Sequence, residues 1–180
     1  MYHPFLVGRK IYLRGLEDKD LSGEYFQWFN DMDTCRYNSH AVFTNREKSM
    51  CDYFESLQGN RNIIVFAIIE KKTDRHVGNV SLQNIDWISR NAEIAFIISA
   101  KHSGKGYGYE AGVLVIGHAF ERLNLIRVYC GTSAENIAMQ KLAVRLGMKK
   151  EGVRRQAMFK TGRYVDMYEF GIVRKGKTSG

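Results

Sequence analysis

The stretch that decides the fold is Ser103-Gly104-Lys105-Gly106-Tyr107-Gly108-Tyr109-Glu110-Ala111-Gly112-Val113. Its first three glycines stand at alternate positions, directly after an apolar run that ends at Ile98. The apolar helical pattern that it opens continues to Leu123. A strand, a glycine loop and a helix N-terminus in this order form an anion site, because backbone N–H groups and the helix dipole favour negative charge. The sequence therefore predicts a phosphorylated cofactor.

The 180 residues predict one domain, residues 1–180, with its core at about 8–175 and a flexible basic tail at 176–180. The chain has 44% hydrophobic and 26% charged residues, which is ordinary for a soluble protein. No apolar run approaches the roughly 20 residues of a membrane span. The start of the chain lacks a basic segment followed by an apolar block, so secretion is not expected. Three widely spaced cysteines fit a reducing cytoplasm. The net charge of +8 is spread along the chain, so we expect neither a nucleic acid nor a membrane partner.

Hydrophobic periodicity predicts seven strands and four helices. The strands are expected at 10–14, 62–70, 77–83, 92–98, 127–131, 148–154 and 164–173, and the helices at 18–30, 46–57, from the glycine loop to about 123, and 136–146. Strands and helices do not alternate regularly, which indicates a mixed α/β sheet.

Two nucleotide motifs match formally, and both lack their structural context. Residues 106–111 satisfy G-x-G-x-x-A, but the strand after the helix, 127–131, carries no acidic residue to hold a ribose. Residues 171–178 satisfy the Walker A pattern, but two residues remain after them, too few for the helix that this loop requires. A nicotinamide oxidoreductase remains one rival interpretation, built on the first match.

Three segments taken together give a better fit: 92–98, 103–108 and 136–148. In this order they resemble the GNAT family of N-acetyltransferases, in its branch with ribosomal-protein N-terminal and amino-sugar acetyltransferases. The opening KIYLRGLEDKD at 10–20 and WFND at 28–31 look like the same branch. The resemblance covers about residues 8–175. It implies a single α/β (α+β) domain with a largely antiparallel sheet, splayed between the strand before the glycine loop and the next.

The resemblance implies acetyl-CoA as the cofactor. The family's Gln/Arg-x-x-Gly-x-Gly/Ala signature falls on 103–108, whose amides would hold the pyrophosphate, with Ser103 where Gln or Arg is usual. Residues 96–98 would bond the pantetheine arm as an added strand edge. Asn136 matches a family Asn near that arm, and Lys141 and Arg145 are candidates for the 3′-phosphate end. The full expected set is Phe96, Ile97, Ile98, Ser103, Gly104, Lys105, Gly106, Tyr107, Gly108, Tyr109, Asn136, Met139, Lys141 and Arg145.

The chemistry implied is acylation of an amine. Glu93 stands in the Ala-Glu-Ile context of a catalytic glutamate of the family, so it is either the general base or an ordinary strand residue. The family's tyrosine general acid falls on Ala143, which leaves the proton donor to the thiolate open. Expected acceptor-binding residues are Trp28, Tyr37, His40, Asp166 and Tyr168. His, Cys and Asp do not cluster at ligand spacing, so no metal is expected.

The sequence thus predicts an acetyl-CoA-dependent N-acetyltransferase that works in a ternary complex, as a monomer or a homodimer. The acceptor is expected to be an amino sugar or a similar small metabolite, with a protein N-terminus or a polyamine as alternatives. Positive net charge disfavours a polycationic acceptor. A catalytically silent acetyl-CoA-binding module is the second rival interpretation.

Overall fold

The computed structural model describes residues 3–176. These residues form a sheet of eight strands in the order β1-β2-β3-β4-β5-β6-β8-β7. The strands are β1 (Leu6–Val7), β2 (Ile11–Gly15), β3 (Ile64–Glu70), β4 (Arg75–Asp86), β5 (Asn91–Ile98), β6 (Arg127–Ser133), β7 (Lys149–Lys160) and β8 (Arg163–Val173). The helices are α1 (Asp18–Leu21), α2 (Glu24–Trp28), α3 (Glu47–Ser56), α4 (Tyr107–Glu121) and α5 (Ile137–Arg145), with a 3-10 turn, η1 (Ala100–His102). Of the expected basic tail, residues 177–180 lie outside the described residues.

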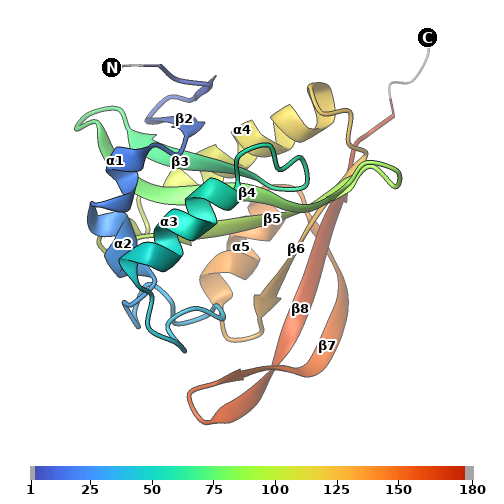
Figure 1. The fold of residues 1–180 in the computed structure, drawn as a ribbon. Helices are drawn as coiled ribbons and strands as arrows, with labels where there is room; N and C mark the ends of the chain where they lie inside the picture. Colours follow the sequence, from blue (N-terminus) through green and yellow to red (C-terminus); the bar gives the residue numbers. More distant parts are fainter. Residues whose placement is uncertain (1–2, 177–180) are drawn as a thin grey trace.

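The helices cover both faces of the sheet. Figure 1 shows α1, α2 and α3 in front of the strands and α4 and α5 behind them. The larger core lies between the sheet and α4 and α5, and a smaller cluster around Tyr25 and Trp28 lies under α1 to α3. No helix among residues 3–176 is long and apolar enough to cross a bilayer.

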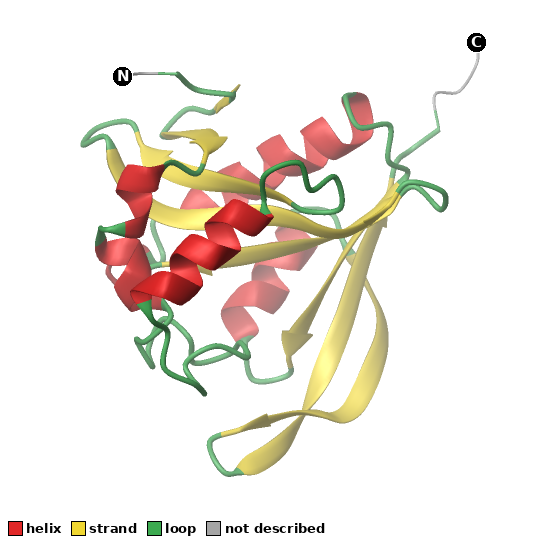
Figure 2. Cartoon of the chain, in the orientation of Figure 1, coloured by secondary structure: helices red, strands yellow, loops and turns green. Residues whose placement is uncertain are grey.

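The expected mixed, largely antiparallel sheet is confirmed, with two differences in element count. The eighth strand is β1, a two-residue strand that pairs with β2. The helix expected at 18–30 is two short helices, because the chain leaves the helical conformation before α2. Gly23, the N-cap of α2, is extended at φ −96 and ψ −159, and glycine is a weak helix former. Figure 2 shows the resulting short turns beside the longer α3.

The sheet opens between β5 and β6, which are its parallel pair. They pair at three positions, and the last is Glu93 with Tyr129. Beyond it, β5 remains paired with β4 as far as Ile98, and β6 remains paired with β8 as far as Ser133. The β6-facing edge of residues 94–98 therefore has no strand partner, as the expected splay requires.

Candidate functional site

A cavity of about 440 Å³ follows the open edge of β5 to the glycine loop and α5. It is lined by 24 residues, among them Phe96, Ile97, Ile98, Ser103, Gly104, Gly106, Tyr107, Gly108, Tyr109, Asn136, Met139, Lys141 and Arg145. The lining residues run from Thr34 to Arg145, so segments 111 positions apart in the sequence share this cavity. Of the residues expected to bind the cofactor, Lys105 does not line the cavity. Its carbonyl oxygen instead accepts a hydrogen bond of 3.3 Å from Lys10 Nζ.

The glycine loop is shaped for a group that approaches the main chain closely. Gly104 and Gly106 have φ values of +77 and +88, which side chains other than glycine rarely adopt. A Cβ built at either position meets nothing within 4 Å, so the space beside the loop is open. Gly106 is the N-cap of α4 and offers no side-chain cap to the first amides of this 15-residue helix. Those amides and the dipole of α4 suit a diphosphate.

The far end of this cavity is basic. The Arg145 guanidinium lies 4.4 Å from the centroid of the Tyr109 ring, and Lys141 lines the same wall. Asn136 is the N-cap of α5, where its Oδ1 accepts a hydrogen bond of 3.0 Å from the amide of Met139. Its amide nitrogen therefore remains to donate to a bound molecule.

A second cavity, of about 550 Å³, lies on the α1–α3 side of the opening. Its floor comes from alternate residues of β4 and β5, which face the same side because side chains alternate along a strand. Its roof comes from α2, α3 and the loop between them. The lining includes Tyr25, Phe29, Tyr37, Asn38, His40, Asn45, Ser49, Tyr53, Asn79, Ser81, Gln83, Glu93, Met158 and Met167.

Glu93 lines both cavities. It is also the last residue of β5 to pair with β6, so its side chain lies where the sheet begins to open. Asn84 Nδ2 donates a hydrogen bond of 3.0 Å to Glu93 Oε2. Among the described residues that line either cavity, Glu93 is the one Asp or Glu. A carboxylate between two cavities can exchange a proton with a molecule in either.

Comparison with known proteins matches residues 10–149 to the acetyltransferase (GNAT) domain model. The chain belongs to the GNAT acetyltransferase family. It is 32% identical over 164 residues to the uncharacterized N-acetyltransferase p20 of Bacillus licheniformis, with 89% of each chain covered. Two solved structures share the fold. Spermidine N-acetyltransferase from Vibrio cholerae, in complex with CoA and spermine, has a TM-score of 0.84 at 24% identity and covers 91% of this chain and 95% of its own. A ribosomal L7/L12 alpha-N-protein acetyltransferase in complex with coenzyme A has a TM-score of 0.85 at 16% identity. The match covers 95% of this chain and 98% of that one.

Membership in the GNAT family makes this chain an acyltransferase and acetyl-CoA its cosubstrate. The glycine loop fits that molecule, because the open space beside Gly104 and Gly106 is where its pyrophosphate would meet the amides of α4. Lys141 and Arg145 are the basic side chains available to a further phosphate.

Three of the five residues expected to bind the acceptor lie outside the second cavity of this acetyltransferase. Trp28 is buried in the small cluster under α1 to α3. Asp166 accepts a hydrogen bond of 2.8 Å from the Gln156 amide on the neighbouring strand. Tyr168 packs beneath Lys150, whose Nζ lies 3.1 Å from the centre of its ring. Tyr37 and His40 do line the second cavity, and Tyr37 lines the first as well.

Sequence reasoning did not single out the polar floor of the second cavity. Asn79, Ser81 and Gln83 alternate with the buried Val80 and Leu82 on β4. The alternation of polar and apolar residues within this strand was the sequence signal that could have identified these three residues. It indicates that one face of β4 meets a polar space rather than the core.

The thiol of Cys130 is a poor candidate for covalent catalysis. The side chain is buried on β6, 1% exposed, and burial raises the pKa of the thiol to about 12. The thiolate is the nucleophilic form, so this acetyltransferase holds Cys130 unreactive.

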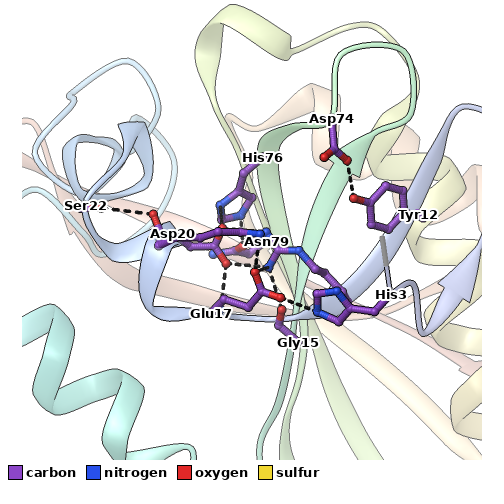
Figure 3. Close-up of polar contacts among 11 residues, drawn as sticks. His3, Tyr12, Gly15, Glu17, Asp20, Ser22, Asp74, His76 and Asn79 are labelled. Atoms are coloured by element: carbon purple, nitrogen blue, oxygen red, sulfur yellow. Dashed lines mark hydrogen bonds and ion pairs between the residues drawn. The ribbon is translucent and has the colours of Figure 1, made fainter. Parts of the chain in front are cut away.

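A buried polar network lies beneath the second cavity (Figure 3). Arg14 on β2 donates two hydrogen bonds to the Asp20 carboxylate, of 2.7 and 2.8 Å, and both side chains are buried. His76 on β4 places Nδ1 3.4 Å from Asp20 Oδ1 and Nε2 2.7 Å from Asn79 Oδ1. Asp20 also accepts a hydrogen bond from the Glu17 amide, which fixes the start of α1. Hydrogen bonds from Arg14 and His76 hold the pKa of Asp20 far below its ordinary value despite burial.

Asp20→Asn should therefore destabilise the fold. The variant removes the carboxylate that accepts two hydrogen bonds from the buried Arg14 guanidinium and leaves it the Glu17 carboxylate at 3.8 Å. We expect the free energy of unfolding to fall by about 3 kcal/mol at pH 7. The pKa of Asp20 is depressed on folding, so its contribution is complete above the unfolded value of about 4 and is lost as the pH falls. Urea denaturation should show the two proteins converging on acidification. A constant difference from pH 7 to pH 3 would contradict the assignment.

Proposed function

We propose that this acetyltransferase acetylates a primary amine by direct attack in a ternary complex, with Glu93 as the general base. The observation that supports this most directly is that Glu93 lines both cavities at the point where β5 and β6 part. When bound, acetyl-CoA supplies the thioester carbonyl that an amine can attack. Glu93 accepts the proton of the incoming ammonium group, directly or through one water. Asn84 holds Oε2 at 3.0 Å, which leaves Oε1 for that proton.

We propose an amino sugar or a similar small metabolite with a neutral body as the acceptor. Polyamine and protein N-terminal acetylation are the alternatives, because the similar solved structures belong to enzymes of those two kinds. Glu93 is the single carboxylate that lines the second cavity among the described residues. A second ammonium group would be desolvated there without a counter-charge, which is unfavourable. Amides, hydroxyls and aromatic rings line part of the wall beside apolar side chains and suit a hydroxyl-bearing molecule.

An acceptor panel tests this proposal. We expect kcat/KM to be at least about tenfold higher for D-glucosamine than for spermidine, an advantage of roughly 1.4 kcal/mol for the neutral body. Release of free thiol from acetyl-CoA measures turnover, and an alanine tripeptide with a free N-terminus completes the panel. A preference for spermidine or for the tripeptide would replace the acceptor assignment. Acetyl-CoA binding without turnover of any amine would favour a silent binding module.

A further inference from the structure

The buried network ends at the wall of the second cavity. It runs from Arg14 through Asp20 and His76 to Asn79, and Figure 3 labels the last three. Asn79 and Tyr25 both line the cavity. Arg14, Asp20 and Asn79 are all buried, and the His76 side chain is 13% exposed. A polar chain of this length beneath an otherwise apolar helix layer fixes the orientation of the groups at its end.

The hydrogen-bonding partners decide which groups of the Arg14–Asp20–His76–Asn79 network donate and which accept. Both ring nitrogens of His76 face oxygen atoms, the Asp20 carboxylate on one side and the Asn79 carbonyl on the other. With its hydrogen on Nε2, the ring donates to Asn79 Oδ1 at 2.7 Å. Asn79 Oδ1 is then committed to His76, and the Asn79 amide nitrogen is left to donate.

Tyr25 receives that donation. Tyr25 and Asn79 line the same cavity, and their side chains hydrogen-bond. Because Asn79 Oδ1 is taken by His76, the amide nitrogen is the Asn79 group left to donate to the Tyr25 oxygen. The ring is held edge-on by Trp28 and Phe29, at centroid distances of 5.4 and 5.3 Å, and is 2% exposed. Burial raises the pKa of Tyr25, so the hydroxyl keeps its proton. The Tyr25 oxygen accepts a hydrogen bond from Asn79, so the Tyr25 hydroxyl hydrogen remains free to donate to a molecule in the cavity.

We propose that the Tyr25 hydroxyl is a fixed hydrogen-bond donor to an oxygen atom of the acceptor, oriented by Asp20, His76 and Asn79. This rests on the proposed function, because it takes the second cavity to be the acceptor site. The acceptor class is then an amine that carries a hydroxyl or carbonyl oxygen away from its reactive nitrogen. A second ammonium group in the same place would face a donor and would be rejected.

The spacing of the two polar ends sets the length of that molecule. Asn79 pairs with Ile97, which lies four residues beyond Glu93 on β5, about 13 Å along the strand. Glu93 and Asn79 line the same cavity, so a molecule that reaches from one to the other spans at most about this length. Straight amino alcohols of four to eight carbons cover the range.

Calorimetry on the protein saturated with coenzyme A tests the donor without requiring turnover. The dissociation constants of the amino alcohols are measured first, and the amino alcohol that binds most tightly is selected. An alkylamine and a diamine of the same chain length are then measured for comparison. Tyr25→Phe keeps the aromatic packing and removes the hydroxyl. We expect it to weaken amino-alcohol binding about five- to tenfold and to leave alkylamine binding within about twofold, as loss of one hydrogen bond predicts. The wild-type protein should bind the diamine least well.

Two further variants separate this result from a loss of folding. Asn79→Ala keeps Tyr25 but releases its hydroxyl, and it should reduce the preference for the amino alcohol in the same direction. Tyr164→Phe removes a hydroxyl from an exposed tyrosine that lines neither cavity and should change nothing. An equal loss for amino alcohol and alkylamine in Tyr25→Phe, or no binding of any of the amines, would overturn the donor. Selective binding without acetylation would instead leave the donor in place and contradict the proposed function.

Discussion

Gly106→Val is expected to abolish acetyl-CoA binding in a chain that remains folded. Gly106 has a φ of +88 at the N-terminus of α4, and a Cβ built there meets open space rather than protein. A valine side chain would fill that space, where the pyrophosphate meets the helix amides. Loss of two charge-assisted hydrogen bonds, worth about 1.5–3 kcal/mol each, raises the dissociation constant at least about 100-fold. Titration calorimetry with acetyl-CoA measures the change.

Gly59→Val is the matched control for that variant. Gly59 also has a positive φ, of +72, and open space around its Cβ, and it lines neither cavity. Both variants force a β-branched residue into the left-handed region, at a cost of about 1–2 kcal/mol in stability. They should therefore lose similar thermal stability, whereas Gly59→Val alone keeps its affinity for acetyl-CoA. Wild-type affinity in Gly106→Val would contradict the role of the loop.

The cofactor loop could be predicted from the sequence because its signal is local. Alternate glycines after an apolar strand constrain the backbone within six residues, and the structure has Gly104 and Gly106 at positive φ. The largely antiparallel sheet was predictable for a similar reason, since each strand carries its own pattern. Lys105 shows the limit of this reasoning. A basic side chain in a phosphate loop suggests a ligand contact, but Lys105 is not among the residues that line the cavity.

The second cavity was harder to predict because its lining comes from segments spread along the sequence from Tyr25 to Met167. Trp28 and Tyr25 lie three residues apart on α2, and no property of the sequence tells which of the two reaches the cavity. The structure buries Trp28 beneath the helices and brings Tyr25 to the wall beside Asn79. α2 begins after the extended Gly23 rather than continuing from α1, so it is not the single helix expected at 18–30. Asp166 and Tyr168 were placed by resemblance, and the pairing of β7 with β8 directs them elsewhere.

Glu93→Gln is expected to lower kcat by about 10²–10⁴-fold, the usual contribution of a positioned general base. Glutamine preserves the size of the side chain and can still bond to Asn84, so the local packing should survive. The cofactor loop lies at the other end of the first cavity, so the affinity for acetyl-CoA should stay within about twofold of wild type. The variant thereby separates proton transfer from binding, which a change at the loop cannot do.

The pH profile decides whether the lost activity is that of a base. In the wild-type protein the pH profile of kcat should contain a limb that reports the general base, and this limb should vanish or shift in Glu93→Gln. Turnover in the variant should then recover at high pH, where the amine loses its proton to solvent without help. Glu121→Gln, at the exposed end of α4 and outside both cavities, controls for the loss of one carboxylate. Rates equal to wild type at every pH would remove Glu93 from the chemistry, and another route for the ammonium proton would then be required.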